Sequence, residues 1–146
     1  MIWPFRRKSK KRMARIVIDE PITSSTRVSV LKALKQIEDR EFPALILRID
    51  SPGGTVGDSQ EIYSAIKRLK EKGCKVVASF GNISASGGVY IGVAAHKIVA
   101  NPGTITGSIG VIIRGNNLSE LLNKIGIKFE TVKSGIYKDI LSPDKP

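Results

Sequence analysis

The 146-residue sequence has one cysteine and one histidine, and aromatic residues make up only 5% of it. The single Cys74 excludes an internal disulfide and is typical of a reducing compartment, where a lone thiol most simply serves as a small buried residue. One histidine and one cysteine at this spacing predict no metal site. The scarcity of aromatic residues predicts a core of Ile, Val, Leu and Ala.

Negative charge is missing from the beginning of the chain. Residues 1–15 carry seven basic residues and no acid, which leaves only +4 of the total net charge of +11 for the rest of the chain. A basic tail on a nearly balanced domain argues against a nucleic-acid partner. Because Trp3 and Phe5 precede the basic block, the tail fits an anionic membrane surface, although a solvated, disordered tail explains it equally well. It lacks the apolar stretch of a signal peptide, so we expect a peripheral protein on the cytoplasmic side of a membrane.

The sequence also lacks a convincing membrane-spanning segment. Val76–Ala95 is a run of 20 uncharged residues, which is about the length of a transmembrane helix. Small and polar residues stand at its centre, where a span should be most apolar. A strand, a tight turn and a helix explain this run better.

The remaining pattern alternates strands with helices and predicts an α/β domain over residues 14–146, after a tail over residues 1–13. The first predicted helix, from about residue 25, is expected to bury Val28, Leu31, Leu34 and Ile37. Nearly continuous apolar strands predict a mainly parallel sheet that is buried on both faces. Strands are predicted at residues 14–19, 44–50, 74–80, 96–100 and 127–133, and helices at about 25–37, 58–72, 86–95 and 118–125.

Two glycine-bearing turns follow predicted strands, where α/β sheets commonly place their chemistry. In "DSPGG", Gly53 and Gly54 can present unobstructed N–H groups to an oxyanion, or they can simply form a tight turn. The sequence that follows lacks the lysine of a phosphate-binding loop, so no nucleotide cofactor is predicted.

The second turn, "SASGG", places Ser86 where a strand passes into a helix. The hydroxyl group would lie at the positive end of that helix, with the N–H of Gly87 facing a developing oxyanion. Ser86 would then be a nucleophile, although a simple helix cap is the competing interpretation. Ser84 is interpreted as a turn or cap residue.

A nucleophilic serine needs a base. His96 stands ten residues after Ser86, at the far end of the predicted helix and about 15 Å away, which disfavours a Ser-His-Asp triad. We interpret His96 as a residue of the helix C-terminus. Lys138 stands among apolar residues, and a lysine can act as a base where burial lowers its pKa.

The segments "DSPGG", "ASGG", "TGSIGV" and "SGIYKDILSP" together resemble signal peptide peptidase A. The resemblance implies the ββα spiral of the Clp protease and crotonase-like fold. It implies Ser86 as the nucleophile, Lys138 as the general base and Ser108 as the hydroxyl that positions the lysine. It assigns the oxyanion hole to the amides of Gly54 and Gly87, with Gly53 supporting the turn.

The implied activity is that of a serine endopeptidase that cleaves signal peptides and other membrane-associated polypeptides through an acyl-enzyme, as a homo-oligomer and without a cofactor. Two departures from the family are a missing transmembrane anchor and an apparent truncation soon after Lys138. Two alternatives remain. The chain can be an inactive truncated subunit that assembles with a relative, or a crotonase-like enzyme acting on acyl-CoA thioesters.

Overall fold

The computed structural model describes residues 12–139 and 142–144. It divides the chain into two compact units, Met1–Gly110 and Val111–Pro146, and each is described by itself. The predicted basic tail, including Trp3 and Phe5, lies almost entirely outside the described residues, so the expected tail boundary and membrane contact stay predictions.

A parallel sheet forms the centre of the first unit. In space the strands follow the order β1 (Ala14–Ile18), β2 (Ala44–Ser51), β3 (Lys75–Ala85) and β4 (Lys97–Val99). β5 (Ile105–Gly107) pairs with the last part of β3, and every one of these pairings is parallel. The predicted α/β architecture with a mainly parallel sheet is therefore confirmed.

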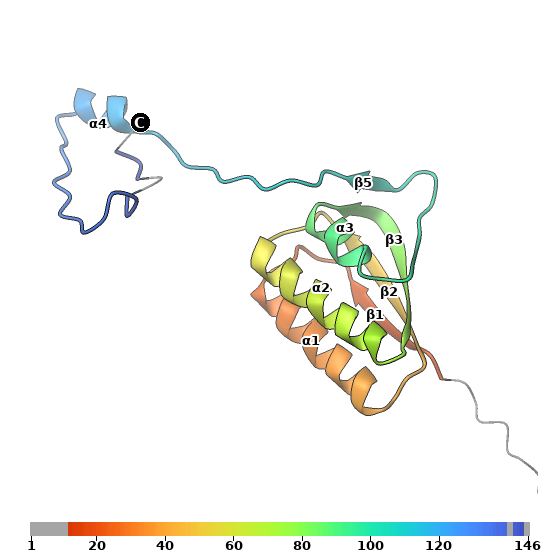
Figure 1. Cartoon of the computed structure of the whole chain (residues 1–146). Coiled ribbons are helices and arrows are strands. Elements are labelled where there is room, and N and C mark those ends of the chain that lie inside the picture. The colour runs from red at the N-terminus through yellow and green to blue at the C-terminus, as the bar shows by residue number, and fades with distance from the viewer. Residues whose placement is uncertain (1–11, 140–141, 145–146) are drawn as a thin grey trace, which may run out of the picture. The chain divides into compact units, whose positions relative to one another are not determined.

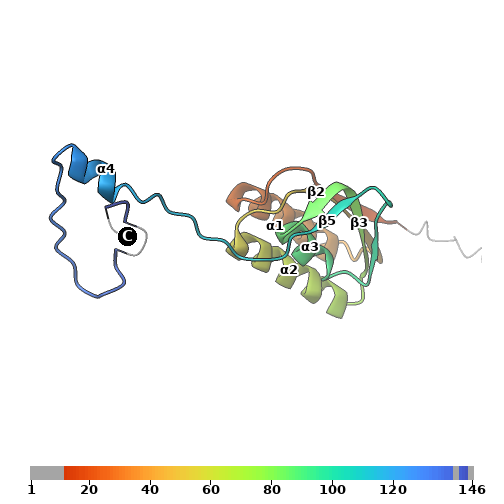
Figure 2. The same cartoon turned by 90° about the horizontal axis from the view of Figure 1, so that it is seen from above.

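Two long helices, α1 (Ser24–Asp39) and α2 (Val56–Glu71), lie side by side across one face of this sheet (Figures 1 and 2). α1 begins with a reciprocal cap between Thr23 and Thr26, which satisfies two N–H groups of the first turn. The short α3 (Gly87–Gly92) follows β3 directly. The sheet and helices thus bring the ends of β2 and β3 close to the beginnings of α2 and α3.

The core lies between the two long helices and the sheet. Leu45, Leu47 and Ile49 on β2 are at most 1% exposed, and Ile62 and Ile66 on α2 are fully buried. Burial of each such side chain contributes about 1.5–3 kcal/mol. The predicted aliphatic core is confirmed, with Phe80, 4% exposed, as the one buried aromatic residue in the described part of the chain.

The prediction that both faces of the sheet are buried is wrong for the first unit. Along β2, buried residues alternate with half-buried ones, and Val17 on β1 remains 43% exposed. Within this unit the helices cover only one face, and the alternation along β2 is that of a sheet with one covered face.

Several predicted boundaries also differ from the structure. In α1, Leu34 and Ile37 are buried as predicted, but Leu31 is only half-buried, and Val30 is buried in place of Val28, which is 57% exposed. β3 continues through Gly81–Ala85, where a turn was expected, and α3 ends at Gly92. The strand β5 was not predicted.

The second unit contains the short helix α4 (Ser119–Lys124). Its N-cap residue Leu118 donates its N–H to the carbonyl of Pro143 at 2.7 Å. Residues 127–133 are irregular, so the predicted strand there is wrong. The ion pair between Lys133 Nζ and Asp139 Oδ1, at 2.6 Å, closes the segment that contains Lys138.

Candidate active site

Ser86 has an unusual backbone conformation. It lies between the end of β3 and the first residue of α3, with φ 50° and ψ −117°. A positive φ is sterically unfavourable for a residue with a side chain and is maintained only where the surrounding structure imposes it. The sharp strand-to-helix turn resembles the elbow that exposes a nucleophile in α/β hydrolases. The side chain is half-buried, and no described residue hydrogen-bonds to its hydroxyl group.

The turn containing Gly53 and Gly54 packs directly against Ser86. Gly53 has φ 98°, and a Cβ atom there would lie 2.8 Å from both Ser86 Cβ and the Gly87 nitrogen. At Gly54 a Cβ would lie 2.0 Å from the carbonyl oxygen of Ile22. Both positions therefore require glycine, because the neighbouring backbone fills the space of a side chain.

Hydrogen bonds fix this turn in place. Ile22 donates its N–H to Gly53 O at 2.9 Å, and Thr55 N–H donates to Ile22 O at 3.0 Å. The buried Ser51 accepts the Gly53 N–H on its Oγ at 3.2 Å. The amides of Gly54 and Gly87, by contrast, have no acceptor among the described residues. The two N–H groups predicted to bind an oxyanion are therefore not hydrogen-bonded to any described residue. Both belong to the first unit.

Ser108 lies beside Ser86, because the parallel pairing of β3 and β5 ends there. Ala85 is paired with Gly107, and the N–H of Ser86 donates to Gly107 O at 2.8 Å. Gly107 and Ser108 both have positive φ, 94° and 54°, so the chain turns sharply at this point. β5 therefore brings the "TGSIG" motif next to the proposed nucleophile.

Lys138 lies in the second unit. Its N–H approaches Gly135 O at 3.5 Å, within the turn closed by the Lys133–Asp139 ion pair, and its side chain is exposed. Since each unit is described by itself, the Ser86–Lys138 pair stays a prediction.

Two other predicted roles need correction. Ser84 is not a turn residue: it is a fully buried residue of β3, paired in register with Ser51, and its hydroxyl has no partner among the described residues. His96 does not end a helix, because α3 stops at Gly92. Its Nδ1 accepts the N–H of Val76 at 3.1 Å, and its own N–H donates to Val76 O at 2.9 Å.

Asp50, the first residue of "DSPGG", was not predicted as a site residue from the sequence. Its carboxylate accepts the N–H of Ile83 at 3.0 Å. Hydrogen bonds from the backbone N–H groups of Ile83 and Asn82 hold the pKa of Asp50 below its ordinary value. An acidic residue directly after a buried strand was the available signal, but only the pairing of β2 with β3 shows what it binds.

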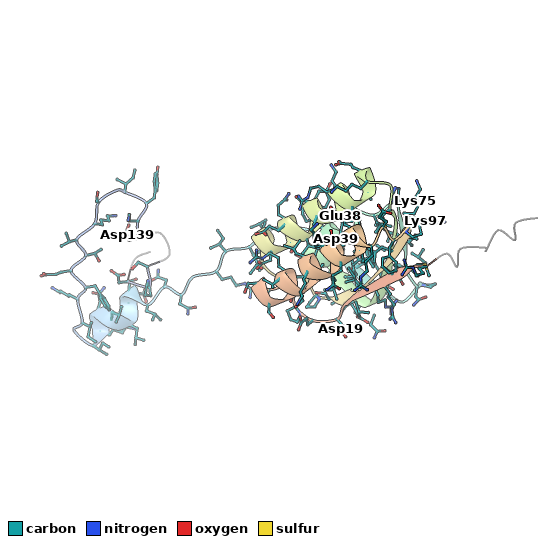
Figure 3. All side chains as sticks on the ribbon, turned by 90° about the horizontal axis from the view of Figure 1, so that it is seen from below. Asp19, Glu38, Asp39, Lys75, Lys97 and Asp139 are labelled. Carbon is teal, nitrogen blue, oxygen red and sulfur yellow. The ribbon has the colours of Figure 1, made fainter. Side chains whose placement is uncertain are left out.

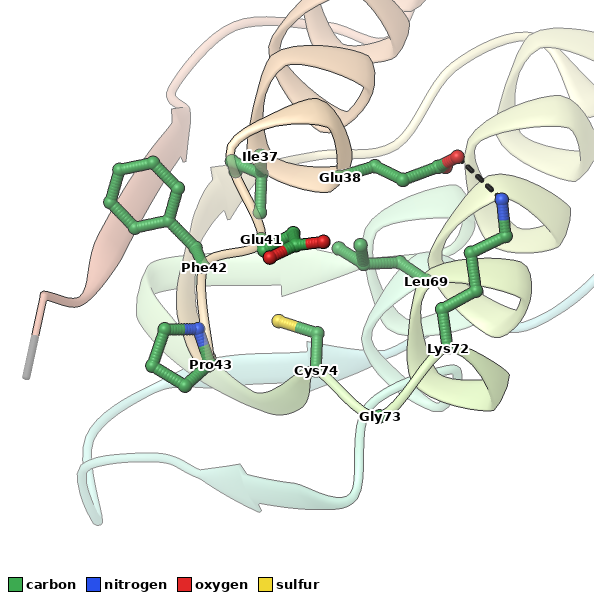
Figure 4. Close-up of a pocket in the computed structure, with 9 residues that line it drawn as sticks. All are labelled: Ile37, Glu38, Glu41, Phe42, Pro43, Leu69, Lys72, Gly73 and Cys74. Atoms are coloured by element: carbon green, nitrogen blue, oxygen red, sulfur yellow. Dashed lines mark hydrogen bonds and ion pairs between the residues drawn. The ribbon is translucent and has the colours of Figure 1, made fainter.

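A pocket of about 330 Å³ lies elsewhere, where α1 and α2 end and β2 and β3 begin (Figure 4). Cys74 points into it, and burial raises the pKa of that thiol, which makes it a poor nucleophile. The ion pair between Glu38 and Lys72 crosses its rim. Figure 3 labels Glu38 and Asp39 near the end of α1, and Lys75 and Lys97 at the first positions of β3 and β4. This end of the sheet is opposite to the end that carries Ser86, so the pocket is not part of the candidate site.

No group of His, Cys, Asp and Glu residues suited to a metal ion occurs in residues 12–139 and 142–144. Over the same residues, every helix is too short or too polar to cross a bilayer.

Comparison with known proteins defines the class to which this fold and site belong. Residues 7–104 match the family described as Clp protease, and the predicted Clp protease-like fold is confirmed. Residues 68–146, slightly more than half of the chain, match the family described as Peptidase family S49. The chain belongs to peptidase family S49.

Individual relatives agree with this assignment. A protease of Synechocystis sp. is 63% identical over 99% of this chain and 52% of its own length. A signal peptide peptidase SppA of Enterococcus faecium is 44% identical over 77% of this chain and 33% of its own length. Among solved structures, the 1510-N membrane protease specific for a stomatin homolog, from Pyrococcus horikoshii, is similar with a TM-score of 0.56 and 27% identity, over 67% of this chain and 48% of that one. The chain therefore spans about half, or less, of the length of these relatives.

Proposed function

We propose that this chain is a serine peptidase in which Ser86 is the nucleophile and Lys138 is the general base. The observation that carries the proposal is the strained backbone of Ser86, held beside a glycine turn whose Gly54 amide, like that of Gly87, has no acceptor in the described structure. Strain of this kind costs about 1–3 kcal/mol and is typical of active sites.

In the proposed reaction, Ser86 Oγ attacks the carbonyl carbon of the scissile peptide bond and gives its proton to the neutral amine of Lys138. The amides of Gly54 and Gly87 donate hydrogen bonds to the oxygen, on which negative charge develops. The C–N bond then breaks, and the leaving amine takes the proton from Lys138. The product is an acyl-enzyme on Ser86.

A water molecule completes the cycle. Lys138 accepts one of its protons while the oxygen attacks the ester, and the same proton returns to Ser86 Oγ when the acid product leaves. Ser108 is proposed to hold the amine of Lys138 in position, since β5 places it next to Ser86.

The proposed substrates are signal peptides and other membrane-associated polypeptides. This proposal is supported by the signal peptide peptidase SppA from Enterococcus and by the membrane protease from Pyrococcus. We further propose that the chain acts as an oligomer at the cytoplasmic side of a membrane, attached by its basic N-terminal residues.

The alternative of a crotonase-like acyl-CoA enzyme would use the same amides to hold an oxyanion. It would have no need of a serine held at φ 50° at the end of β3. The geometry of Ser86 therefore favours the peptidase.

Cleavage of a synthetic signal peptide, followed by mass spectrometry, tests this function. The wild-type chain should cut the peptide, and Ser86→Ala should reduce the rate by about 10⁴-fold or more, as is typical when a nucleophile is removed. Ser84→Ala is the matched control, since it removes a buried hydroxyl two residues away and should leave cleavage intact. Equal cleavage by wild type and Ser86→Ala would contradict the proposal.

A further inference from the structure

β3 contains a bulge immediately before the candidate site. β2 and β3 pair in regular register up to Ile49 and Phe80, and the next pair is Ser51 with Ser84. On β2 only Asp50 separates these pairs, whereas on β3 the three residues Gly81, Asn82 and Ile83 do. Two additional residues are therefore accommodated opposite one aspartate, and bulges of this kind commonly re-aim a strand next to an active site.

The carboxylate of Asp50 occupies the centre of this bulge. Asp50 Oδ1 accepts the N–H of Ile83 at 3.0 Å, and the N–H of Asn82 also bonds to this carboxylate. A Cβ atom on Gly81 would lie 2.2 Å from Asp50 Oδ2, so the carboxylate takes the space that a side chain would need. From the other side, Thr104 Oγ1 donates to Gly81 O at 2.8 Å.

The bulge determines where Ser86 stands relative to the glycine turn. Two strand residues correspond to about 6.6 Å of chain. In the structure, Gly53 is so close to this segment that a Cβ on Gly53 would lie 2.8 Å from Ser86 Cβ and from the Gly87 nitrogen. Without the bulge, Ser86 and Gly87 would be displaced along the strand by about the length of these two residues, and this close contact would be lost. Because the insertion is an even number of residues, the strand keeps its buried and exposed faces.

We propose that Asp50 is a positioning residue: its carboxylate holds the bulge open and so sets the register that brings Ser86 and Gly87 against the Gly53–Gly54 turn. The functional part of this inference rests on the proposed role of Ser86 as a nucleophile. The structural part concerns the bulge alone and does not depend on catalysis.

The functional test is saturation kinetics of a fluorophosphonate probe on Ser86. Asp50→Ala should lower the maximal labelling rate by about 10²-fold with little change in the concentration for half-saturation, because a small misplacement of reacting groups has an effect of that size. Asp50→Asn retains one acceptor oxygen and should restore most of the rate.

Arg48→Ala is the matched control. Arg48 lies two residues earlier on β2 and also reaches across to β3, where its guanidinium donates to Phe80 O at 2.9 Å and to Ser79 Oγ at 3.1 Å. Its loss should reduce stability but leave labelling near the wild-type rate. A labelling rate for Asp50→Ala equal to wild type, or an equal loss in Arg48→Ala, would overturn the inference.

Hydrogen exchange supplies the test that needs no activity. In Asp50→Ala the amides of Asn82 and Ile83 should exchange faster, and so should the amide of Ser86, which donates to Gly107 O in the wild type. If wild type fails to label but these amides respond, the proposed function fails and the structural role of Asp50 stands. Unchanged exchange at all three amides would overturn that role.

A double-mutant cycle with Gly81 tests the same contact. Gly81→Ala should be severely destabilising in wild type, where the new methyl group meets the Asp50 carboxylate. In the Asp50→Ala background the added cost should be smaller, because the carboxylate atoms at 2.2 and 2.3 Å are gone and only the Cβ of residue 50, at 2.7 Å, still meets the new methyl group. Additive effects of the two substitutions would contradict the proposed arrangement.

Discussion

Ser86 is held in a backbone conformation that is sterically unfavourable for serine and therefore reduces the stability of the folded state. Its φ of 50° disfavours any residue with a Cβ atom, whereas glycine adopts it without strain. We therefore expect Ser86→Gly to be more stable than Ser86→Ala by about 1 kcal/mol, although both lack the hydroxyl. Urea denaturation of the two variants measures this difference. A Gly variant less stable than the Ala variant would show that the turn is not strained.

Asp50 gives a second prediction at the scale of the residue. Hydrogen bonds from Ile83 and Asn82 lower the pKa of its carboxyl in the folded state. Its contribution to stability should therefore be fully present above the unfolded-state pKa of about 3.9, and should be lost as the pH falls through the lower folded-state value.

Asp50→Asn cannot titrate at this position, so the stability difference between wild type and this variant should shrink as the pH falls below about 4. Denaturation midpoints measured from neutral pH to pH 2 give this difference. A constant or growing difference on acidification would contradict the role assigned to the carboxylate.

At the scale of the element, α3 packs against the sheet through Gly92. A Cβ on Gly92 would lie 2.5 Å from the ring of Phe80, whereas a Cβ on Gly57, in the first turn of α2, meets nothing within 4 Å. Gly92→Ala should destabilise the protein by about 1–3 kcal/mol, because it overpacks the core. Gly57→Ala, the control, should stabilise it by up to about 1 kcal/mol through helix propensity. Thermal unfolding measures both, and equal effects would contradict the packing of α3.

The elements differ in how well the sequence predicts them. β1, β2, α1 and α2 follow from local patterns of apolar residues, although in α1 the buried stripe includes Val30 rather than the expected Val28. β3 does not, since Gly81 and Asn82 are typical of turns. They remain in the strand because Asp50, 33 residues before Ile83 in the chain, binds the amides of the bulge. A local sequence pattern cannot predict a contact between residues so far apart in the chain.

The candidate site divides in the same way. The turn residues Gly53, Gly54 and Gly87 and the serine at position 86 could be proposed from the sequence because small residues cluster after strands, and their roles stay predictions. The proximity of Ser108 depends on β5, a strand of three residues that is too short to leave a period-two pattern. The strand expected at residues 127–133 does not form in the described second unit. These residues have a strand-like apolar pattern, but they pair with no other strand there.

At the scale of the whole molecule, the proposed membrane attachment depends on charge at the N-terminus. Residues 1–15 carry seven basic residues, and each contributes about 1 kcal/mol of attraction near an anionic surface. The wild-type chain should float with vesicles containing phosphatidylserine. A variant with Arg6, Arg7, Lys8, Lys10 and Lys11 changed to Gln should remain in the soluble fraction. Failure of wild type to float would contradict the attachment.

We propose that Ser86 and Lys138 act together, although they belong to separate units of the chain. The most direct measurement is labelling with a fluorophosphonate probe, located by peptide mass spectrometry, in wild type, Ser86→Ala and Lys138→Ala. We expect the label on Ser86 in wild type and its loss in both variants. Lys128→Ala, in the same unit, is the control and should label normally. Absence of label in folded wild type, or full labelling of Lys138→Ala, would show that Ser86 and Lys138 do not act as a pair.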